Sequence, residues 1–148
     1  MSDKSTFSDE EWRALVDAPM YISMMMAAVG SHGPISMAKE SMASAKAITR
    51  PSNHEKANLL ISQIAKEAEG KEARHDTRHH KAANIQVLVD ELLGDLEPAK
   101  KALAKIPADE AAGVVEWFVD IAQAVAEAAQ GVKPEEQETI ERIKKAFA

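Results

Sequence analysis

The stretch Val-Val-Glu-Trp-Phe-Val-Asp-Ile-Ala-Gln-Ala-Val-Ala-Glu-Ala-Ala at residues 114–129 decides the fold class. Its apolar side chains recur every three or four residues, which places them on one face of an α-helix. The members of this face are Val114, Phe118, Ile121, Ala122, Val125 and Ala129. The pattern predicts a helix with one buried face that ends before Gly131.

The rest of the chain carries further helix signals and no strand signal. Ser8 and Glu11 have the spacing of a capping box, and Phe7 and Trp12 flank it with the spacing of a hydrophobic staple. The expected helices cover residues 9–29, with a kink at Pro19; 36–48; 53–93, as one helix or as two that meet near Gly70; 98–105; the stretch quoted above; and a last stretch that begins at Pro134 and carries Ile140, Ile143 and Phe147. No alternating run of β-branched residues is long enough for a strand, so the sequence predicts an all-α bundle of six or seven helices.

Length and composition fit a single domain. The chain has 148 residues, of which 45% are apolar and none is cysteine. A chain of this length buries an adequate core without disulfides, and we expect a flexible N-terminus at residues 1–7 followed by one all-helical domain at residues 8–148. The absence of cysteine excludes disulfide frameworks, thiolate zinc sites, iron–sulfur clusters and thiol nucleophiles.

The charge balance limits the classes of partner. Lys and Arg number 18 against 24 Asp and Glu, which gives a formal net charge of -6. Nucleic acids and anionic membranes attract excess positive charge, so neither is an expected partner. The sequence has no apolar run of about 18 residues, and residues 1–4 lack the apolar core of a signal peptide. We therefore expect a cytoplasmic protein without membrane insertion.

The two ends of the chain show the same order of features. Trp12 precedes an apolar run at residues 22–29, a loop with glycine and a polar helix. Trp117 likewise precedes an apolar run at residues 121–129, a glycine and a helix rich in glutamate. A helix pair that occurs twice predicts a pseudo-twofold helical domain whose two hairpins pack across the long middle stretch.

Residues 121–147 carry a resemblance to a known family. They contain Ala-Val-Ala-Glu-Ala-Ala at 124–129, a glycine, and Lys-Pro-Glu-Glu at 133–136, followed by Ile140, Ile143 and Phe147. In these features the chain resembles the TerB-like family of bacterial proteins, first associated with tellurite resistance, and residues 12–48 resemble it more weakly. The resemblance implies a single pseudo-twofold helical domain and an association with stress response, without a particular reaction.

The turns of this chain depart from the pattern of that family. Members of the TerB-like family often carry Asp-Gly and downstream acids that form acidic, metal-binding sites near each turn. Here the turns read Ser31-His32-Gly33 and Gln130-Gly131, so the acid before the glycine is missing from both. The resemblance therefore supplies no metal site at either turn.

One cluster has the residue types of a metal site. Residues 72–80 read Glu-Ala-Arg-His-Asp-Thr-Arg-His-His, and on a helix Glu72, His75 and His79 fall on one face. Carboxylate and neutral imidazole suit zinc, iron or manganese, so these three residues are the candidate ligands of a divalent metal, zinc or iron. Di-iron helical bundles use two Glu-x-x-His steps and two further Glu residues. This chain has one such step, so a homodimer would have to supply the second.

The same histidine-rich segment has a second interpretation. Its charged side chains would form a solvated, salt-bridged helix face at the point where the helix is interrupted. His32 in the glycine loop and His54 beside a helix cap are expected to be ordinary surface residues. Both interpretations of residues 72–80 remain open on the sequence alone.

Three classes of function follow from these patterns. The first is a non-enzymatic helical module of the TerB-like type that binds another protein or assembles with itself, for example as a homodimer. The second is a metal-binding protein that uses Glu72, His75 and His79. The third is an enzyme, a di-metal oxidase, whose carboxylate set is incomplete. The sequence has no Gly-x-Ser-x-Gly elbow and no Gly-rich phosphate loop, so we assign no catalytic residue and no cofactor site and expect the first class.

Overall fold

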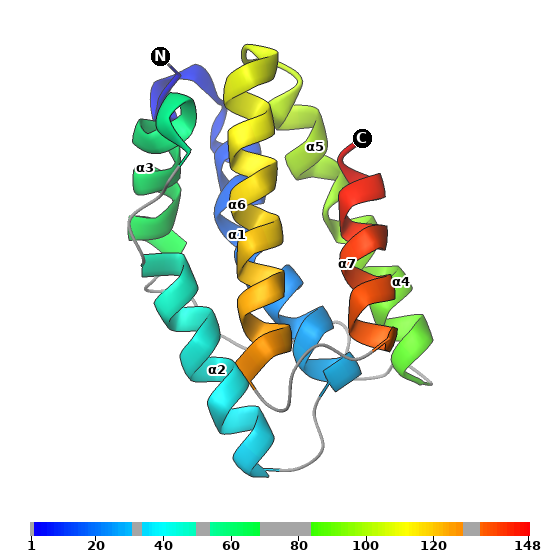
Figure 1. Cartoon of the computed structure of the whole chain (residues 1–148). Coiled ribbons are helices and arrows are strands. Elements are labelled where there is room, and N and C mark those ends of the chain that lie inside the picture. The colour runs from blue at the N-terminus through cyan, green and yellow to red at the C-terminus, as the bar shows by residue number, and fades with distance from the viewer. Residues whose placement is uncertain (1, 31–33, 50–53, 69–83, 129–133) are drawn as a thin grey trace.

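The regular elements that the computed structural model describes are all helices (Figure 1). The structure describes residues 2–30, 34–49, 54–68, 84–128 and 134–148, with the backbone alone for residues 34–41. Its elements are η1 (Lys4–Thr6), α1 (Asp9–Gly30), α2 (Pro34–Thr49), η2 (Glu55–Ala57), α3 (Asn58–Ala68), α4 (Ile85–Asp95), α5 (Glu97–Leu103), α6 (Ala108–Ala128) and α7 (Pro134–Ala146). No strand occurs among these described residues, so the predicted all-α class is confirmed.

The start of α1 is set by the predicted capping box. The N–H of Ser8 donates to Oε1 of Glu11 at 2.8 Å, and Oγ of Ser8 accepts the N–H of Glu11 at 3.2 Å. The rings of Phe7 and Trp12 lie 6.1 Å apart, so the hydrophobic staple packs beside the box. These two contacts fix the path by which the chain enters the helix, which then continues through Pro19.

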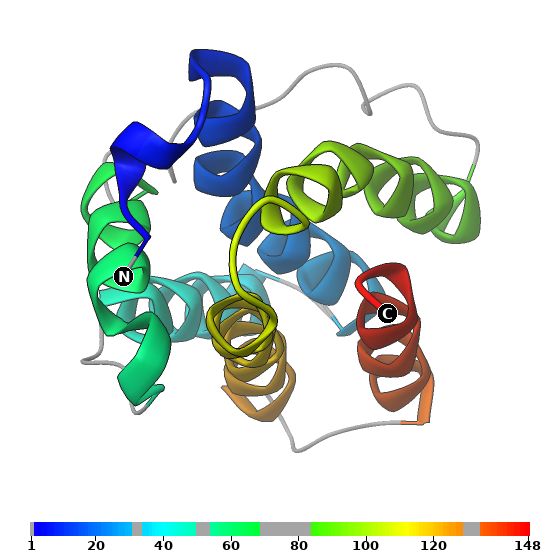
Figure 2. The same cartoon turned by 90° about the horizontal axis from the view of Figure 1, so that it is seen from above.

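Two expected helix boundaries differ in the structure. α2 begins at Pro34 and not after a cap at Ser36, because the fixed φ of proline and its missing N–H suit the first turn of a helix. In the region expected at residues 53–93, α3 and α4 are separate helices on opposite sides of the bundle (Figure 2). The region therefore holds two helices and not one continuous helix, and the expected meeting point near Gly70 lies outside the described residues.

α1 lies at the centre of the bundle and contacts every other α-helix (Figure 2). The predicted apolar runs face the core over their described residues, 22–29 and 121–128, where Ile22, Met25 and Ile121 are fully buried. The expected packing of the two hairpins across the middle stretch holds in part, since α1 packs against α3 and α4 but also directly against α6. α1 takes the central place because it carries buried side chains on several of its faces.

The two ends of the chain form two helix pairs, α1 with α2 and α6 with α7. In Figure 1, α1 and α6 run from the top of the bundle to the bottom, while α2 and α7 run back toward the top. α2 packs against both α1 and α6, and α7 packs against the same two helices. α1 and α6 are thus each in contact with both α2 and α7.

Candidate functional site

An open groove of about 600 Å³ lies between α5, α6 and the end of α7. Its apolar lining includes Leu103, Ile106, Ala111, Val115 and Phe147. The apolar α6 residues of the groove lie beside the core face that holds Val114, Phe118 and Ile121, and they are Ala108, Ala111, Ala112 and Val115. The small side chains leave the space between the three helices unfilled.

The floor of the groove is held in place by the core. Leu103 and Ile106 are almost completely buried, with 4% and 7% of their surface exposed. The ring of Phe147 lies 5.5 Å from the ring of Phe118, which is fully buried, so the end of α7 is anchored to α6. The groove is therefore a stable feature of the packed bundle, formed by helices whose positions the core fixes.

Three charged side chains line the groove. Lys100 stands on α5, Lys144 on α7 and Glu116 on α6. Lys144 also forms an exposed ion pair with Glu141 on its own helix, at 3.2 Å. An exposed pair of this kind contributes only a few tenths of a kcal/mol, so Lys144 can exchange this partner for another at small cost.

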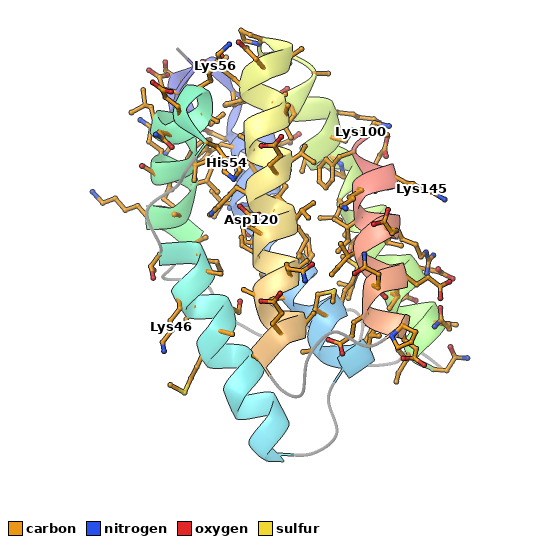
Figure 3. The ribbon with its side chains drawn as sticks, in the orientation of Figure 1. Lys46, His54, Lys56, Lys100, Asp120 and Lys145 are labelled. Carbon is orange, nitrogen blue, oxygen red and sulfur yellow. The ribbon has the colours of Figure 1, made fainter. Side chains whose placement is uncertain are left out.

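The carboxylate of Glu116 is engaged on the other side of α6, by His54 (Figure 3). Nδ1 of His54 lies 3.0 Å from Oε2 of Glu116, and Nε2 lies 2.8 Å from Oδ2 of Asp120. The His54 side chain is only 16% exposed, so it is not the ordinary surface residue that the sequence suggested. Because both ring nitrogens face carboxylate oxygens, neither is open to act as a general base in this arrangement.

The contact of His54 is one part of a seam between η2 and α6. Nζ of Lys56 lies 3.1 Å from Oδ2 of Asp109, and its hydrogen bond lowers the pKa of the Asp109 carboxyl below its usual value. Gly113 lies between these two polar contacts and allows Ala57 to approach closely. The seam holds the segment before α3 on the face of α6 that lies opposite Lys100 in Figure 3, so its role is structural.

Sequence reasoning missed this seam, although one signal was present. Asp109, Gly113, Glu116 and Asp120 recur at the spacing of one face of a helix. A face of acids is also typical of a solvated surface, so only the glycine in its middle hints at a close approach. The pairing of that face with His54 and Lys56 depends on tertiary structure, which periodicity does not give.

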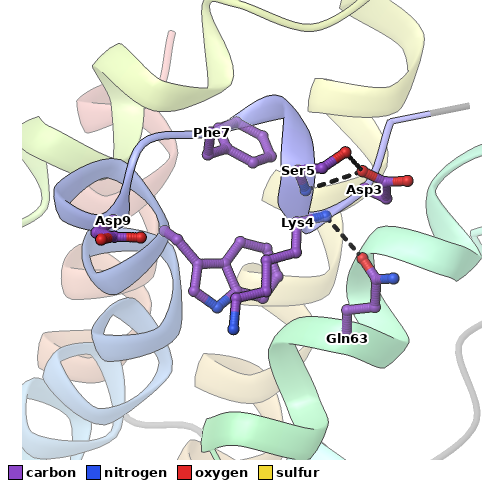
Figure 4. Close-up of a pocket in the computed structure, with 7 residues that line it drawn as sticks. Asp3, Lys4, Ser5, Phe7, Asp9 and Gln63 are labelled. Atoms are coloured by element: carbon purple, nitrogen blue, oxygen red, sulfur yellow. Dashed lines mark hydrogen bonds between the residues drawn. The ribbon is translucent and has the colours of Figure 1, made fainter.

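A second, smaller pocket of about 470 Å³ lies beside the N-terminal segment (Figure 4). The backbone N–H of Lys4 donates to Oε1 of Gln63 at 2.9 Å, and Nζ of Lys4 lies 5.7 Å from the centre of the Trp12 ring. Nζ of Lys4 also pairs with Glu67 at 3.4 Å. The only cation in this pocket lining is therefore already engaged by the chain's own groups, which makes the larger groove the better candidate for a binding site.

The predicted metal ligands Glu72, His75 and His79 lie outside the described residues, as does His32. Within the residues that are described, no group of three or more His, Asp or Glu side chains is arranged to hold a metal ion. His54 with Glu116 and Asp120 is no exception, since its ring nitrogens are used in the contacts given above. The metal hypothesis for residues 72–79 stays a prediction.

Comparisons with known proteins do not assign a function to the groove. No model of a protein family matches the chain, and searches of curated proteins and of solved structures find no match either. Among the described residues, no helix is both long enough and apolar enough to cross a membrane. The groove and its charged rim are thus the features of the molecule that bear on its function.

Proposed function

We propose that the protein is a non-enzymatic, cytoplasmic helical module of the TerB-like type that binds another protein or a second copy of itself. The observation that carries the proposal is the open apolar groove between α5, α6 and α7. Apolar grooves between helices are places where peptide segments and helices of other proteins dock. A role in stress response is the part of the proposal that rests on family resemblance alone.

The arrangement of the two helix pairs supports a pseudo-twofold domain. Exchanging α1 with α6 and α2 with α7 leaves the helix directions in Figure 1 unchanged, because α1 and α6 run one way and α2 and α7 run the other. The same exchange converts the packing of α2 on α6 into the packing of α7 on α1, and both contacts exist. This is the relation expected of a duplicated helix pair whose axis runs along the bundle.

The chemistry of the groove supports a binding role over a catalytic one. Its charged lining consists of two lysines and one glutamate, and the glutamate is engaged by His54. Acyl or phosphoryl transfer requires a nucleophile next to a base, or a positioned metal, within reach of a substrate. The groove lining offers an apolar surface and positive charge, which are the means of holding a partner.

The test is site-specific photo-crosslinking in the cell that makes the protein. A photoreactive phenylalanine analogue replaces Val115 in the groove, and a control chain carries it at Leu59, which is 41% exposed on α3. We expect a defined protein adduct at position 115 that disappears when Ala111→Glu places a charge in the groove, and no such adduct at position 59. Sedimentation of the purified chain then distinguishes a second copy from a different protein. Crosslinking that is equal at both positions would refute the proposal.

A further inference from the structure

We infer that the groove between α5, α6 and α7 binds an acidic amphipathic helix of a partner protein, with apolar side chains in the groove and carboxylates at its two edges. The inference rests on the proposed function and adds the chemistry of the partner. Its basis is the combination of an apolar floor with lysines on two different helices of the rim.

The apolar part of the groove fits the stripe of one helix. The floor is formed by Leu103 and Ile106, and the α6 wall by Ala111 and Val115, whose side chains are small or half-buried. A cavity volume of about 600 Å³ accommodates several aliphatic or aromatic side chains. Helices that dock in such grooves insert residues at positions i, i+3, i+4 and i+7, so a single apolar stripe suffices.

The charged side chains at the rim of the groove favour one sign of charge on the partner. Lys100 is half-buried at the groove, and within the described part of the chain no carboxylate forms an ion pair with it. Glu116 would oppose an acidic partner, and its carboxylate pairs with His54. The groove lining thus carries two lysines against one glutamate, although the whole chain carries a net charge of -6. This contrast favours a partner with acids beside its apolar side chains.

The placement of the two lysines favours a helix over a small anion. Lys100 belongs to α5 and Lys144 to α7, so the two lysines come from different helices of the groove. A single carboxylate or phosphate on an apolar tail presents one charge at one end. An amphipathic helix presents acids along both edges of its apolar stripe, so it can meet a lysine on each of two helices.

The inference is tested with designed peptides and the purified full chain. The acidic probe is an alanine-based helical peptide with a leucine stripe at i, i+3, i+4 and i+7 that is flanked by glutamates. A matched probe has lysine in place of each glutamate, and a third keeps the composition of the acidic probe but breaks the stripe. Fluorescence anisotropy measures the Kd of each. We expect the acidic probe to bind the wild type at least about tenfold more tightly than either matched probe.

Charge reversal identifies the groove as the site. Lys100→Glu/Lys144→Glu should reverse the preference, so that the lysine probe binds more tightly than the acidic one. The control Lys46→Glu/Lys66→Glu makes the same change in net charge at exposed positions on α2 and α3 and should leave the preference unchanged. Lys46 lies away from Lys100 in Figure 3. Val115→Glu should abolish binding of both probes, with its helical circular dichroism retained.

The failure of this inference is distinguishable from the failure of the proposed function. Equal binding of acidic and basic probes, or no binding of any probe, would overturn the acidic helix. Adducts at position 115 in the crosslinking experiment would still stand in that case and would keep the interaction module. Self-association that is lost in Val115→Glu while no probe binds would identify a second copy as the occupant and would also overturn the inference.

Discussion

Gly113 on α6 lies directly against Ala57 of η2. A Cβ added to Gly113 would come 2.7 Å from Cβ of Ala57, a distance that real Cβ atoms do not adopt. The close approach allows His54 and Lys56, which both precede Ala57 in the chain, to reach the acids of α6. The glycine is therefore a packing requirement of the η2–α6 seam.

Gly113→Ala should destabilise the protein although alanine is the better helix former. The added methyl group must displace η2, and overpacking of this kind costs roughly 1–3 kcal/mol, against a gain of about 1 kcal/mol in helix propensity. We expect a net loss of about 1 kcal/mol in the free energy of unfolding, measured by urea denaturation. Ala57→Gly in the same chain should recover part of the loss, because it removes the atom that clashes.

Gly94 provides the matched control for this substitution. It lies in α4, and a Cβ added there would meet nothing within 4 Å. Gly94→Ala should therefore leave the stability unchanged or raise it by up to about 1 kcal/mol. Equal effects of Gly113→Ala and Gly94→Ala would show that helix propensity alone decides both, and the packing role of Gly113 would be wrong.

The sequence predicts the helices well because their signals are local. The capping box at Ser8 and Glu11 and the apolar face of residues 114–129 depend on neighbours along the chain, and both are present. The packing partners of each helix depend on contacts between distant residues, so the central place of α1 was not predictable from periodicity. The same limit explains why His54 was taken for a surface residue, since its partners lie 62 and 66 positions along the chain at Glu116 and Asp120.

The ion pair between Glu11 and Lys105 gives the protein a stability that depends on pH. Nζ of Lys105 lies 2.6 Å from Oε2 of Glu11. Hydrogen bonds from Lys105 and then from the Ser8 backbone lower the pKa of Glu11 from 4.5 to about 2. Because the folded-state pKa is depressed, this contribution is present in full above pH 4.5 and is lost as the pH falls toward 2.

The measurement compares the unfolding free energy of the wild type with that of Glu11→Gln from pH 7 to pH 2. The difference between the two proteins should be constant from pH 7 to about 5 and should shrink below that. In a Lys105→Met background, the difference in unfolding free energy caused by Glu11→Gln should shrink less. The hydrogen bond from Lys105, which is the largest cause of the lowered pKa of Glu11, is then absent. A difference that stays constant down to pH 2 would contradict the assignment of this pH window to Glu11.

Ser2 is tied to a buried carboxylate, which bears on the expected flexibility of residues 1–7. The Ser2 N–H donates to Oε1 of Glu110 at 2.7 Å, and its hydroxyl donates to Oε2 at 2.9 Å. Glu110 is only 6% exposed, so these bonds are shielded from water. Glu110→Ala should release residues 2–6, with a drop in their heteronuclear NOE values, whereas Glu97→Ala at an exposed position of α5 should not.

The heteronuclear NOE values of the wild type decide whether residues 2–6 are held against Glu110 or are flexible. High NOE values for Ser2 to Thr6 that fall in Glu110→Ala would establish the tether. Low values in the wild type itself would confirm the flexible N-terminus that the sequence suggests, and the contacts to Glu110 would then contribute little. Ser2→Ala removes only the hydroxyl bond and should give an intermediate result, since the backbone N–H still donates.

The metal hypothesis for Glu72, His75 and His79 makes a prediction that needs no knowledge of their placement. If these residues bind a divalent ion, apo protein titrated with zinc or iron(II) should take up metal stoichiometrically, as isothermal titration calorimetry measures. A site of neutral imidazoles and a carboxylate should lose affinity as the pH falls through about 6.5, because protons compete for the imidazole nitrogens. His75→Ala/His79→Ala should abolish the uptake.

His32 supplies the control for that titration. It lies outside the cluster in the sequence, whereas His54 is unsuitable because both of its ring nitrogens contact carboxylates in the η2–α6 seam. His32→Ala removes an imidazole outside the cluster, so general binding of metal to surface histidines would weaken in this variant as well. Loss confined to His75→Ala/His79→Ala, together with a mass that doubles on metal uptake, would support a site shared by two copies. Uptake at background level in the wild type would end the metal hypothesis and leave the interaction module as the function to pursue.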